Sequence, residues 1–323
     1  MTQLRASPCV VTSEASDVAR FAKSDLRCLL YHGDCREMLE AMPASSVQLV
    51  VTSPPYNIGK QYEARLALKE YLDLQREVIA QCVRVLHDSG SLCWQVGNHI
   101  VGDAEILPLD LALHPIFEAE GLKLRNRIVW HFEHGLHCKK RFSGRYEVIL
   151  WYTKSDDYCF DLDPVRIPQK YPGKRHMRGP RNGELSGHPL GKNPTDVWII
   201  PNVKHNHREK TIHPCQFPIE LVDRLVLAFT RPGDLVLDPF AGVSSALAAA
   251  IIRQRRGCGA ELRRQYVEVS RRRIEGALDG TLPVRPTGRP VYEPGDQRVA
   301  QLPPEFAEAR LLRDGGDLPM PQP

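Results

Sequence analysis

Residues 234–245 decide the fold, and they read Asp-Leu-Val-Leu-Asp-Pro-Phe-Ala-Gly-Val-Ser-Ser. A short apolar run of β type leads into a turn with a proline and a glycine, and the alanine-rich residues 242–253 predict a helix. A second strand is expected at 257–260 and an amphipathic helix at 264–277. This alternation with short connections predicts a βαβ unit with parallel strands.

The turn after the first of these strands has the features of a nucleoside-binding turn. Gly242 lets the backbone approach a ligand closely, and Glu261, after the second strand, can accept hydrogen bonds from ribose hydroxyls. A tight turn between a strand and a helix would favour glycine even without a ligand. The order of strand, turn, helix, strand and acid is what favours a binding site.

The N-terminal half repeats the same rhythm. A helix is expected where apolar residues recur at three- and four-residue spacing between Tyr71 and Leu86, with Gly90 as its C-terminal glycine. Strands are expected at 26–31, 47–51, 91–96, 127–132 and 146–153, followed by an apolar stretch at 158–162. Together with the C-terminal unit, these elements predict an α/β fold with a mostly parallel, twisted sheet and helices on both faces.

A second motif, Thr52-Ser-Pro-Pro-Tyr-Asn57, follows the strand at 47–51. Two consecutive prolines cannot continue a strand, so the Pro54 carbonyl is expected to face outward as an acceptor beside the Ser53 hydroxyl. The ring of Tyr56 offers a flat platform on which a planar ligand can stack. A Pro-Pro turn with a packing tyrosine is the alternative that the motif alone leaves open.

Between residues 164 and 210 the periodicity fails and basic residues dominate. They are Arg166, Lys170, Lys174, Arg175, Arg178, Arg181, Lys192, Lys204, Arg208 and Lys210, against three acidic residues. A solvated loop and a polyanion-binding segment both fit this composition. The net charge is only +4, from 43 Lys+Arg and 39 Asp+Glu, so a nucleic-acid partner must be inferred from this cluster.

Composition also indicates the class and the compartment. Of the 323 residues 42% are hydrophobic, as in globular proteins, and no apolar stretch is long enough to span a membrane. The N-terminus does not read as a secretory signal, and the nine cysteines form no CxxC pair, so a cytoplasmic protein without disulfides is expected. Four residues have spacings that a metal could use, but no second ligand pair accompanies them, and no metal site is predicted: His131, His134, His137 and Cys138.

Three motifs taken together resemble one enzyme family. They are Ser53-Pro-Pro-Tyr56, His213-Pro-Cys-Gln-Phe-Pro218 and Asp238-Pro-Phe-Ala-Gly242. In this order they resemble the DNA amino-methyltransferases of bacterial restriction-modification systems, and within these the permuted β class, in which the catalytic tetrapeptide precedes the cofactor motif. The resemblance implies a Rossmann-like, S-adenosylmethionine-dependent methyltransferase fold with an irregular target-recognition insertion.

The resemblance also implies the roles of individual residues. The catalytic residues would be Ser53, Pro54, Pro55 and Tyr56. S-adenosylmethionine would be bound by Asp34, Ser53, His213, Asp238, Phe240, Ala241, Gly242 and Glu261. DNA would be contacted by Arg166, Lys174, Arg175, Arg178, Arg181, Lys204 and Arg208. The chain departs from the family pattern at Ser244 and Ser245, where a glycine and a threonine are usual, and at Phe217, where a lysine is usual.

The implied reaction transfers a methyl group to an exocyclic amino group of a base in double-stranded DNA, after the base has been swung out of the helix. Serine at position 53 is typical of enzymes that act on cytosine N4, which we therefore expect, with adenine N6 as the alternative. Methylation of RNA or of a protein amide, and a regulator that binds S-adenosylmethionine and nucleic acid without turnover, remain open. A homodimer and a cognate restriction endonuclease acting on the same site are further partners that the resemblance suggests.

These assignments predict five segments. Residues 1–25 form an N-terminal extension, 26–163 the catalytic half and 164–210 the target-recognition region. Residues 211–280 form the cofactor-binding half. Residues 281–323 form a flexible, proline-rich tail with at most a short helix at 304–313.

Overall fold

The computed structural model describes residues 9–59, 63, 65–101, 105–132, 135, 137–204 and 206–289. The chain divides into two compact units, Met1–Thr287 and Gly288–Pro323. The short helix expected at 304–313 lies outside the described residues, as does residue 134.

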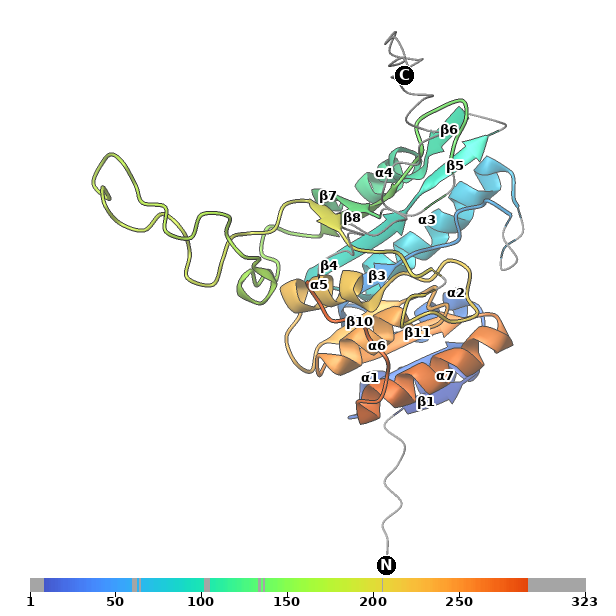
Figure 1. The fold of residues 1–323 in the computed structure, drawn as a ribbon. Coiled ribbons are helices and arrows are strands. Elements are labelled where there is room, and N and C mark those ends of the chain that lie inside the picture. The colour runs from blue at the N-terminus through green and yellow to red at the C-terminus, as the bar shows by residue number, and fades with distance from the viewer. Residues whose placement is uncertain are drawn as a thin grey trace, which may run out of the picture. The chain divides into compact units, whose positions relative to one another are not determined.

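A mixed sheet of nine strands forms the centre of the first unit (Figure 1). Its spatial order is β1-β2-β11-β10-β3-β4-β8-β7-β9. All pairs from β1 to β4 are parallel, β8 is antiparallel to both of its neighbours, and β9 is parallel to β7. The strands are β1 (Cys9–Thr12), β2 (Cys28–His32), β3 (Val47–Thr52), β4 (Leu86–Val96), β7 (Lys123–His131), β8 (Tyr146–Thr153), β9 (Val197–Ile199), β10 (Leu235–Asp238) and β11 (Arg256–Glu261). A separate hairpin pairs β5 (Asn98–Val101) with β6 (Glu105–Pro108).

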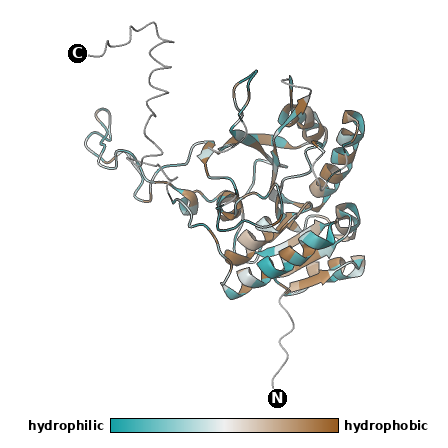
Figure 2. Ribbon diagram, turned by 45° about the vertical axis from the view of Figure 1, so that its right-hand side comes forward, coloured by the Kyte–Doolittle hydropathy of each residue, from teal (hydrophilic) through white to brown (hydrophobic). Residues whose placement is uncertain are grey.

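Helices cover both faces of this sheet, as the sequence predicts. The core on one face contains side chains of α1 (Ala15–Ala22), α2 (Cys35–Ala41), α3 (Leu68–Val85) and α4 (Leu109–Ala119). The core on the other face contains those of α5 (Ile219–Phe229), α6 (Ser245–Ile252) and α7 (Arg264–Asp279). Figure 2 shows the strands mainly in the brown of hydrophobic residues, which is expected for a sheet buried on both sides.

Small residues bring α6 close to the sheet. Every residue of α6 except its last is buried. On β11, a Cβ atom at Gly257 would lie 3.2 Å from Leu247 Cγ, and one at Gly259 would lie 2.8 Å from the Asp238 carbonyl oxygen. The two glycines therefore allow the close helix–strand packing that places the turn after β10.

The chain order is permuted within the sheet. The C-terminal strands β10 and β11 lie between β2 and β3, which are consecutive among the strands of the large sheet in sequence. The carboxyl ends of β3 and β10 are therefore adjacent, so the Ser-Pro-Pro-Tyr and Asp-Pro-Phe-Ala-Gly segments emerge side by side. Residues 9–22, predicted to be part of an extension, form β1 and α1, and β1 adds an edge strand beside β2.

The prediction for Gly90 is wrong. Helix α3 ends at Val85 and β4 starts at Leu86, so Gly90 is not a helix cap but lies within the strand. A Cβ atom at Gly90 would come within 2.7 Å of a Leu86 methyl group, so close packing against the preceding residues accounts for this glycine. The apolar stretch at 158–162 is irregular, and its aromatic side chains pack beside Trp151 instead of pairing as a strand.

The segment from 164 to 196 has no long regular element. It contains the end of a short 3-10 helix (Asp163–Val165) and two isolated bridges, Ile167–Lys192 and Arg175–Leu185, and it returns to the sheet at β9 (Figure 1). This geometry agrees with the irregular insertion that the sequence predicts. Most residues of the segment are exposed.

Candidate active site

The carboxyl ends of the parallel strands open onto one cavity of about 630 Å³. Because β8 runs antiparallel, its amino end lies at this same edge of the sheet. Eleven of the predicted site residues line the cavity: Asp34, Ser53, Pro54, Pro55, Tyr56, Lys204, His213, Phe240, Ala241, Gly242 and Glu261. The structure thus brings together residues from both halves of the sequence.

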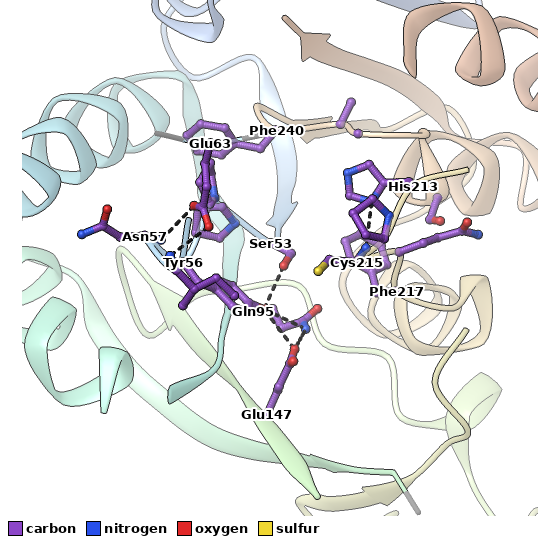
Figure 3. A pocket seen from close by; sticks show the side chains of 18 of the residues that line it. Ser53, Tyr56, Asn57, Glu63, Gln95, Glu147, His213, Cys215, Phe217 and Phe240 are labelled. Atoms are coloured by element: carbon purple, nitrogen blue, oxygen red, sulfur yellow. Dashed lines mark hydrogen bonds between the residues drawn. The ribbon is translucent and has the colours of Figure 1, made fainter. Parts of the chain in front are cut away.

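Ser53 and Tyr56 belong to a hydrogen-bonded cluster on one wall (Figure 3). The Tyr56 hydroxyl lies 2.9 Å from Ser53 Oγ and donates to Glu147 Oε2 at 3.0 Å. Gln95 Nε2 donates to the Tyr56 hydroxyl at 3.2 Å and also to Glu147 Oε2. Burial raises the pKa of Tyr56 well above its usual value and also raises the pKa of Glu147. The Tyr56 hydroxyl is therefore a neutral link between Ser53 and Glu147.

Glu63 supports the turn that follows the tetrapeptide. Its two carboxylate oxygens accept hydrogen bonds from the backbone N–H groups of Asn57, at 2.8 Å, and Ile58, at 2.9 Å. Asn57 adopts a left-handed conformation, φ 59°, which asparagine tolerates better than most residues. Its side chain exchanges two hydrogen bonds with the backbone of Leu66. These contacts hold the chain after Tyr56 in a defined path.

Asp238 lies behind the cavity rather than in its wall. It is fully buried, and its Oδ1 accepts hydrogen bonds from Thr52 Oγ1 at 2.6 Å and from the Phe240 backbone N–H at 3.1 Å. Burial raises the pKa of this carboxyl to about 7, although the two hydrogen bonds oppose the shift. Its Oδ2 has no hydrogen-bond partner among the described residues.

Glu261 stands at the end of β11 and faces the cavity. Its carboxylate accepts hydrogen bonds from the backbone N–H groups of Arg263, at 2.6 Å, and Gly242, yet burial raises its pKa to about 7. Gly242 has φ 54°, so the turn uses the conformational freedom of glycine. The geometry agrees with the predicted turn with an acidic residue on the neighbouring strand.

His213 closes the cavity above this turn. A Cβ atom at Gly242 would lie 3.4 Å from His213 Nε2, and the imidazole packs edge to face on Tyr266 with ring centroids 4.6 Å apart. Burial lowers the pKa of His213 to about 4. The histidine is therefore neutral at physiological pH. In Figure 3, His213, Cys215 and Phe217 lie across the cavity from the Tyr56 cluster.

Asp34 lines the cavity and is the N-cap residue of helix α2. Its carboxylate accepts a hydrogen bond from the Arg36 backbone N–H and forms an ion pair with the Arg36 guanidinium at 2.7 Å. The hydrogen bond from the Arg36 side chain is the main reason that the pKa of Asp34 is lowered. The lowered pKa keeps Asp34 as a carboxylate at neutral pH. Arg36 also pairs with Glu77 of α3.

The basic residues of the insertion have different surroundings. Arg166 is largely buried, with its side chain 14% exposed, and pairs with Asp163, while Arg181 pairs with Glu184. Arg175 donates to the Gly183 carbonyl. Three other members of the predicted set are exposed outside the cavity, namely Lys174, Arg178 and Arg208. Of the seven predicted DNA-contacting residues, Lys204 alone lines the cavity.

Sequence reasoning missed Gln95, Glu147 and Glu63. Gln95 is a polar residue in the apolar last part of β4, residues 92–96, and Glu147 stands at the start of the apolar strand β8. A polar residue in an otherwise apolar strand is the signal that could have pointed to both. For Glu147 the direction of β8 also had to be known, since only an antiparallel strand brings its first residues to this edge.

The described ranges contain neither a cluster of metal-ligating side chains nor a membrane-spanning helix. Within them, His, Cys, Asp and Glu side chains form no group of three or more that could hold a metal ion. Of the four residues whose spacing a metal could use, His134 lies outside those ranges. In the part of the chain that the structure describes, no helix is both long and apolar enough to cross a membrane.

The sequence is similar to that of known DNA methyltransferases. A family model described as DNA methylase matches residues 47–272. The type II methyltransferase M.BglII of Bacillus subtilis is 51% identical over 250 residues, which cover 77% of this chain and 69% of the relative. The DNA adenine methyltransferase YhdJ of Escherichia coli (strain K12) is 35% identical over 254 residues, covering 77% of this chain and 83% of that protein.

Solved structures agree with the fold. The PvuII DNA methyltransferase, described as cytosine-N4-specific, superposes with a TM-score of 0.63 and covers 79% of this chain and 93% of its own, at 21% identity. A putative DNA modification methylase of Thermus thermophilus, solved in complex with S-adenosyl-L-methionine, is 28% identical, with a TM-score of 0.55 and coverage of 78% and 96%. The chain belongs to the DNA methylase family and is an S-adenosylmethionine-dependent DNA amino-methyltransferase of the restriction-modification type.

Proposed function

We propose that the protein methylates the exocyclic N4 of cytosine at a specific site in duplex DNA. The observation that carries this proposal is Ser53 at the first position of the tetrapeptide, with its hydroxyl in the cavity wall 2.9 Å from the Tyr56 hydroxyl. Serine at this position is typical of cytosine-N4 enzymes in the family that the motifs resemble.

The cavity suits the cofactor. The carboxylate of Glu261 offers acceptors for ribose hydroxyls, and the left-handed turn at Gly242 leaves room for close approach. We assign Phe240, Ala241 and Gly242 to the cofactor pocket, with Asp238 beneath them, where its carboxyl accepts the hydrogen bond from the Phe240 backbone N–H and so supports the turn. Asp34 would lie near the adenine and His213 near the methionine end. When bound, S-adenosylmethionine supplies an electrophilic methyl group on a sulfonium.

Ser53 and Pro54 would activate the amino group. The nitrogen is a weak nucleophile because its lone pair is delocalised into the ring of the base. Two acceptors, the Ser53 hydroxyl and the Pro54 carbonyl, would bind its two protons, favour a pyramidal nitrogen and stabilise the positive charge that develops on it. The nitrogen itself would then attack the methyl carbon as the bond from that carbon to sulfur breaks, so that S-adenosylhomocysteine leaves and the methylated nitrogen releases one proton. No covalent bond to the enzyme is required.

Base flipping would bring the cytosine to Ser53. The amino group is paired inside a duplex, and moving the base out costs on the order of a few kcal/mol of stacking and pairing. The ring of Tyr56 would stack on the extruded base. Hydrogen bonds between its hydroxyl group and the side chains of Ser53 and Glu147 hold this ring in place. Lys204 at the cavity and the exposed side chains of Lys174, Arg178 and Arg208 would contact the phosphates.

Adenine N6 is the second candidate. A specific observation favours it, since the relative that is 35% identical is named a DNA adenine methyltransferase. The two substrates present the same two amino protons to the same acceptors, so the mechanism above holds for both.

Product analysis separates the candidates. DNA methylated by the purified protein is digested to nucleosides and examined by mass spectrometry, and N4-methylcytosine is the expected product. N6-methyladenine would replace the cytosine proposal by the adenine one, whereas 5-methylcytosine would contradict the mechanism. Mapping the modified positions would identify the recognised sequence. A homodimer and a cognate endonuclease remain predictions.

A further inference from the structure

We propose that Glu147 is a positioning residue that sets the direction of the hydrogen bonds ending at Ser53, so that Ser53 presents lone pairs to the target amino group. The inference rests on the proposed function, because it concerns how that reaction is oriented. It assigns a role to a residue outside the tetrapeptide, on a strand of opposite direction.

The contacts form a short chain with a defined end. Glu147 Oε2 lies 3.0 Å from the Tyr56 hydroxyl, which lies 2.9 Å from Ser53 Oγ. Gln95 Nε2 donates to the Tyr56 hydroxyl at 3.2 Å and to the same carboxylate oxygen. All four side chains line the cavity (Figure 3).

The donor and acceptor inventory determines where each proton lies. When Glu147 is ionised, its carboxylate only accepts hydrogen bonds, so the single proton of the Tyr56 hydroxyl points to Glu147. The Tyr56 oxygen then accepts from Gln95 and from Ser53, which places the Ser53 proton toward Tyr56. The lone pairs of Ser53 remain for the amino group, which is the arrangement that attack by nitrogen requires.

Protonation of Glu147 would reverse this order. Burial raises the pKa of Glu147, while hydrogen bonds from Tyr56 and Gln95 and the charge of Lys204 lower it. The titratable and charged groups around the cluster are Tyr56 after β3, Lys204 after β9, and Cys215, which faces Tyr56 from the segment before α5. A neutral Glu147 can donate a hydrogen bond to the Tyr56 oxygen. The Tyr56 hydroxyl then donates to Ser53 Oγ, and the Ser53 proton points toward the amino group.

The test compares Glu147→Gln, Tyr56→Phe and the double variant in single-turnover methyl transfer with saturating DNA and S-adenosylmethionine. Each single change is expected to lower the rate roughly tenfold or more, with cofactor affinity unchanged. The double variant should be no slower than Tyr56→Phe, because Glu147 acts through that hydroxyl. In the natural chain the rate should fall as pH falls through the Glu147 pKa, and this limb should be absent from Glu147→Gln.

A matched control is available outside the cavity. Glu37 accepts a hydrogen bond from the buried Tyr31 hydroxyl at 2.8 Å, the same type of pair, so Glu37→Gln should keep both the rate and its pH profile. If Glu147→Gln does not fold, Tyr56→Phe alone tests the proposal, since it interrupts the chain and should remove the same acidic limb.

Three results would overturn the inference: a natural rate in Glu147→Gln, multiplicative losses in the double variant, or an acidic limb that persists in Tyr56→Phe. These outcomes are distinct from failure of the proposed function. If the natural chain produces 5-methylcytosine the proposed function fails, whereas amino-group methylation without coupling between the two residues rejects the role of Glu147 alone.

Discussion

Thr52 and Asp238 lie 186 residues apart in the chain, and they share a hydrogen bond of 2.6 Å between Oγ1 and Oδ1. Both residues are fully buried, at the ends of the adjacent strands β3 and β10. The bond thus joins the last residue before Ser53 to the first residue of the Asp-Pro-Phe-Ala-Gly turn. The two segments are therefore held together by a buried side-chain hydrogen bond as well as by the pairing of β3 with β10.

Asp238 should make the apo-protein less stable as pH rises. Its pKa is raised to about 7 in the folded chain, so between about pH 4 and pH 7 the folded state binds more protons than the unfolded state. The free energy of unfolding therefore falls across this range. Asp238→Asn keeps acceptors for Thr52 and Phe240 without the buried charge, and we expect it to be more stable at pH 8 by on the order of 1–4 kcal/mol.

Urea unfolding at pH 5 and pH 8 measures this slope. The exposed residue Asp196 gives the matched control, since Asp196→Asn should follow the natural chain at both values. If the free energy of unfolding changed equally with pH in Asp238→Asn and in the natural chain, the Asp238 carboxyl would not be held neutral in the folded protein.

Ser53→Ala should lower the rate of methyl transfer on the order of 10²-fold, because one acceptor of an amino proton is removed from the transition state. Calorimetry should show a much smaller change in the affinity for S-adenosylmethionine. Turnover at the natural rate would exclude Ser53 as a catalytic residue.

Glu261 should make cofactor affinity dependent on pH. Ribose hydroxyls donate to the ionised carboxylate, whose pKa in the free protein is about 7, so affinity should weaken as pH falls below this value. Glu261→Gln should weaken binding at pH 8 and flatten the dependence. Glu268 on the exposed side of α7 serves as the control, and a pH-independent affinity in the natural chain would contradict the assignment.

The exposed bases of the insertion should set the salt dependence of DNA binding. Neutralising Lys174, Arg178 and Arg208 together should weaken binding, and the slope of log K against the logarithm of salt concentration should fall by up to about 0.9 for each phosphate that is no longer neutralised. Arg272→Gln, on the exposed side of α7, should leave that slope unchanged. If the salt slope of the triple variant equalled that of the natural chain, the segment would be a solvated loop that does not contact DNA phosphates.

Strands such as β2, β8 and β10 were predictable because they are almost continuous apolar runs. Strand β8 has the bounds that its sequence predicts, and β11 extends one residue beyond its predicted range at each end. The end of α3 was not predictable, because Gly90 carries the same signal whether it caps a helix or relieves crowding within a strand.

Motifs placed Ser53 and Phe240 in the cavity lining, since both residues follow strands that end at one edge of the sheet. They did not reveal Glu147, whose position depends on the direction of β8. Arg166 was predicted to contact DNA, but the sequence did not show that it pairs with Asp163 and is largely buried. Both depend on contacts that spacing along the chain does not encode.

The permuted strand order also has a consequence for synthesis on the ribosome. Strands β2 and β3 are made early but have β11 and β10 between them, so they have no direct partner in each other. The sheet can close only after residue 261 has emerged, when two late strands enter between two early ones. Until then β2 and β3 each expose an edge of unpaired backbone N–H and C=O groups. A nascent chain that ends before residue 261 depends on its helices, or on a chaperone, to cover these edges.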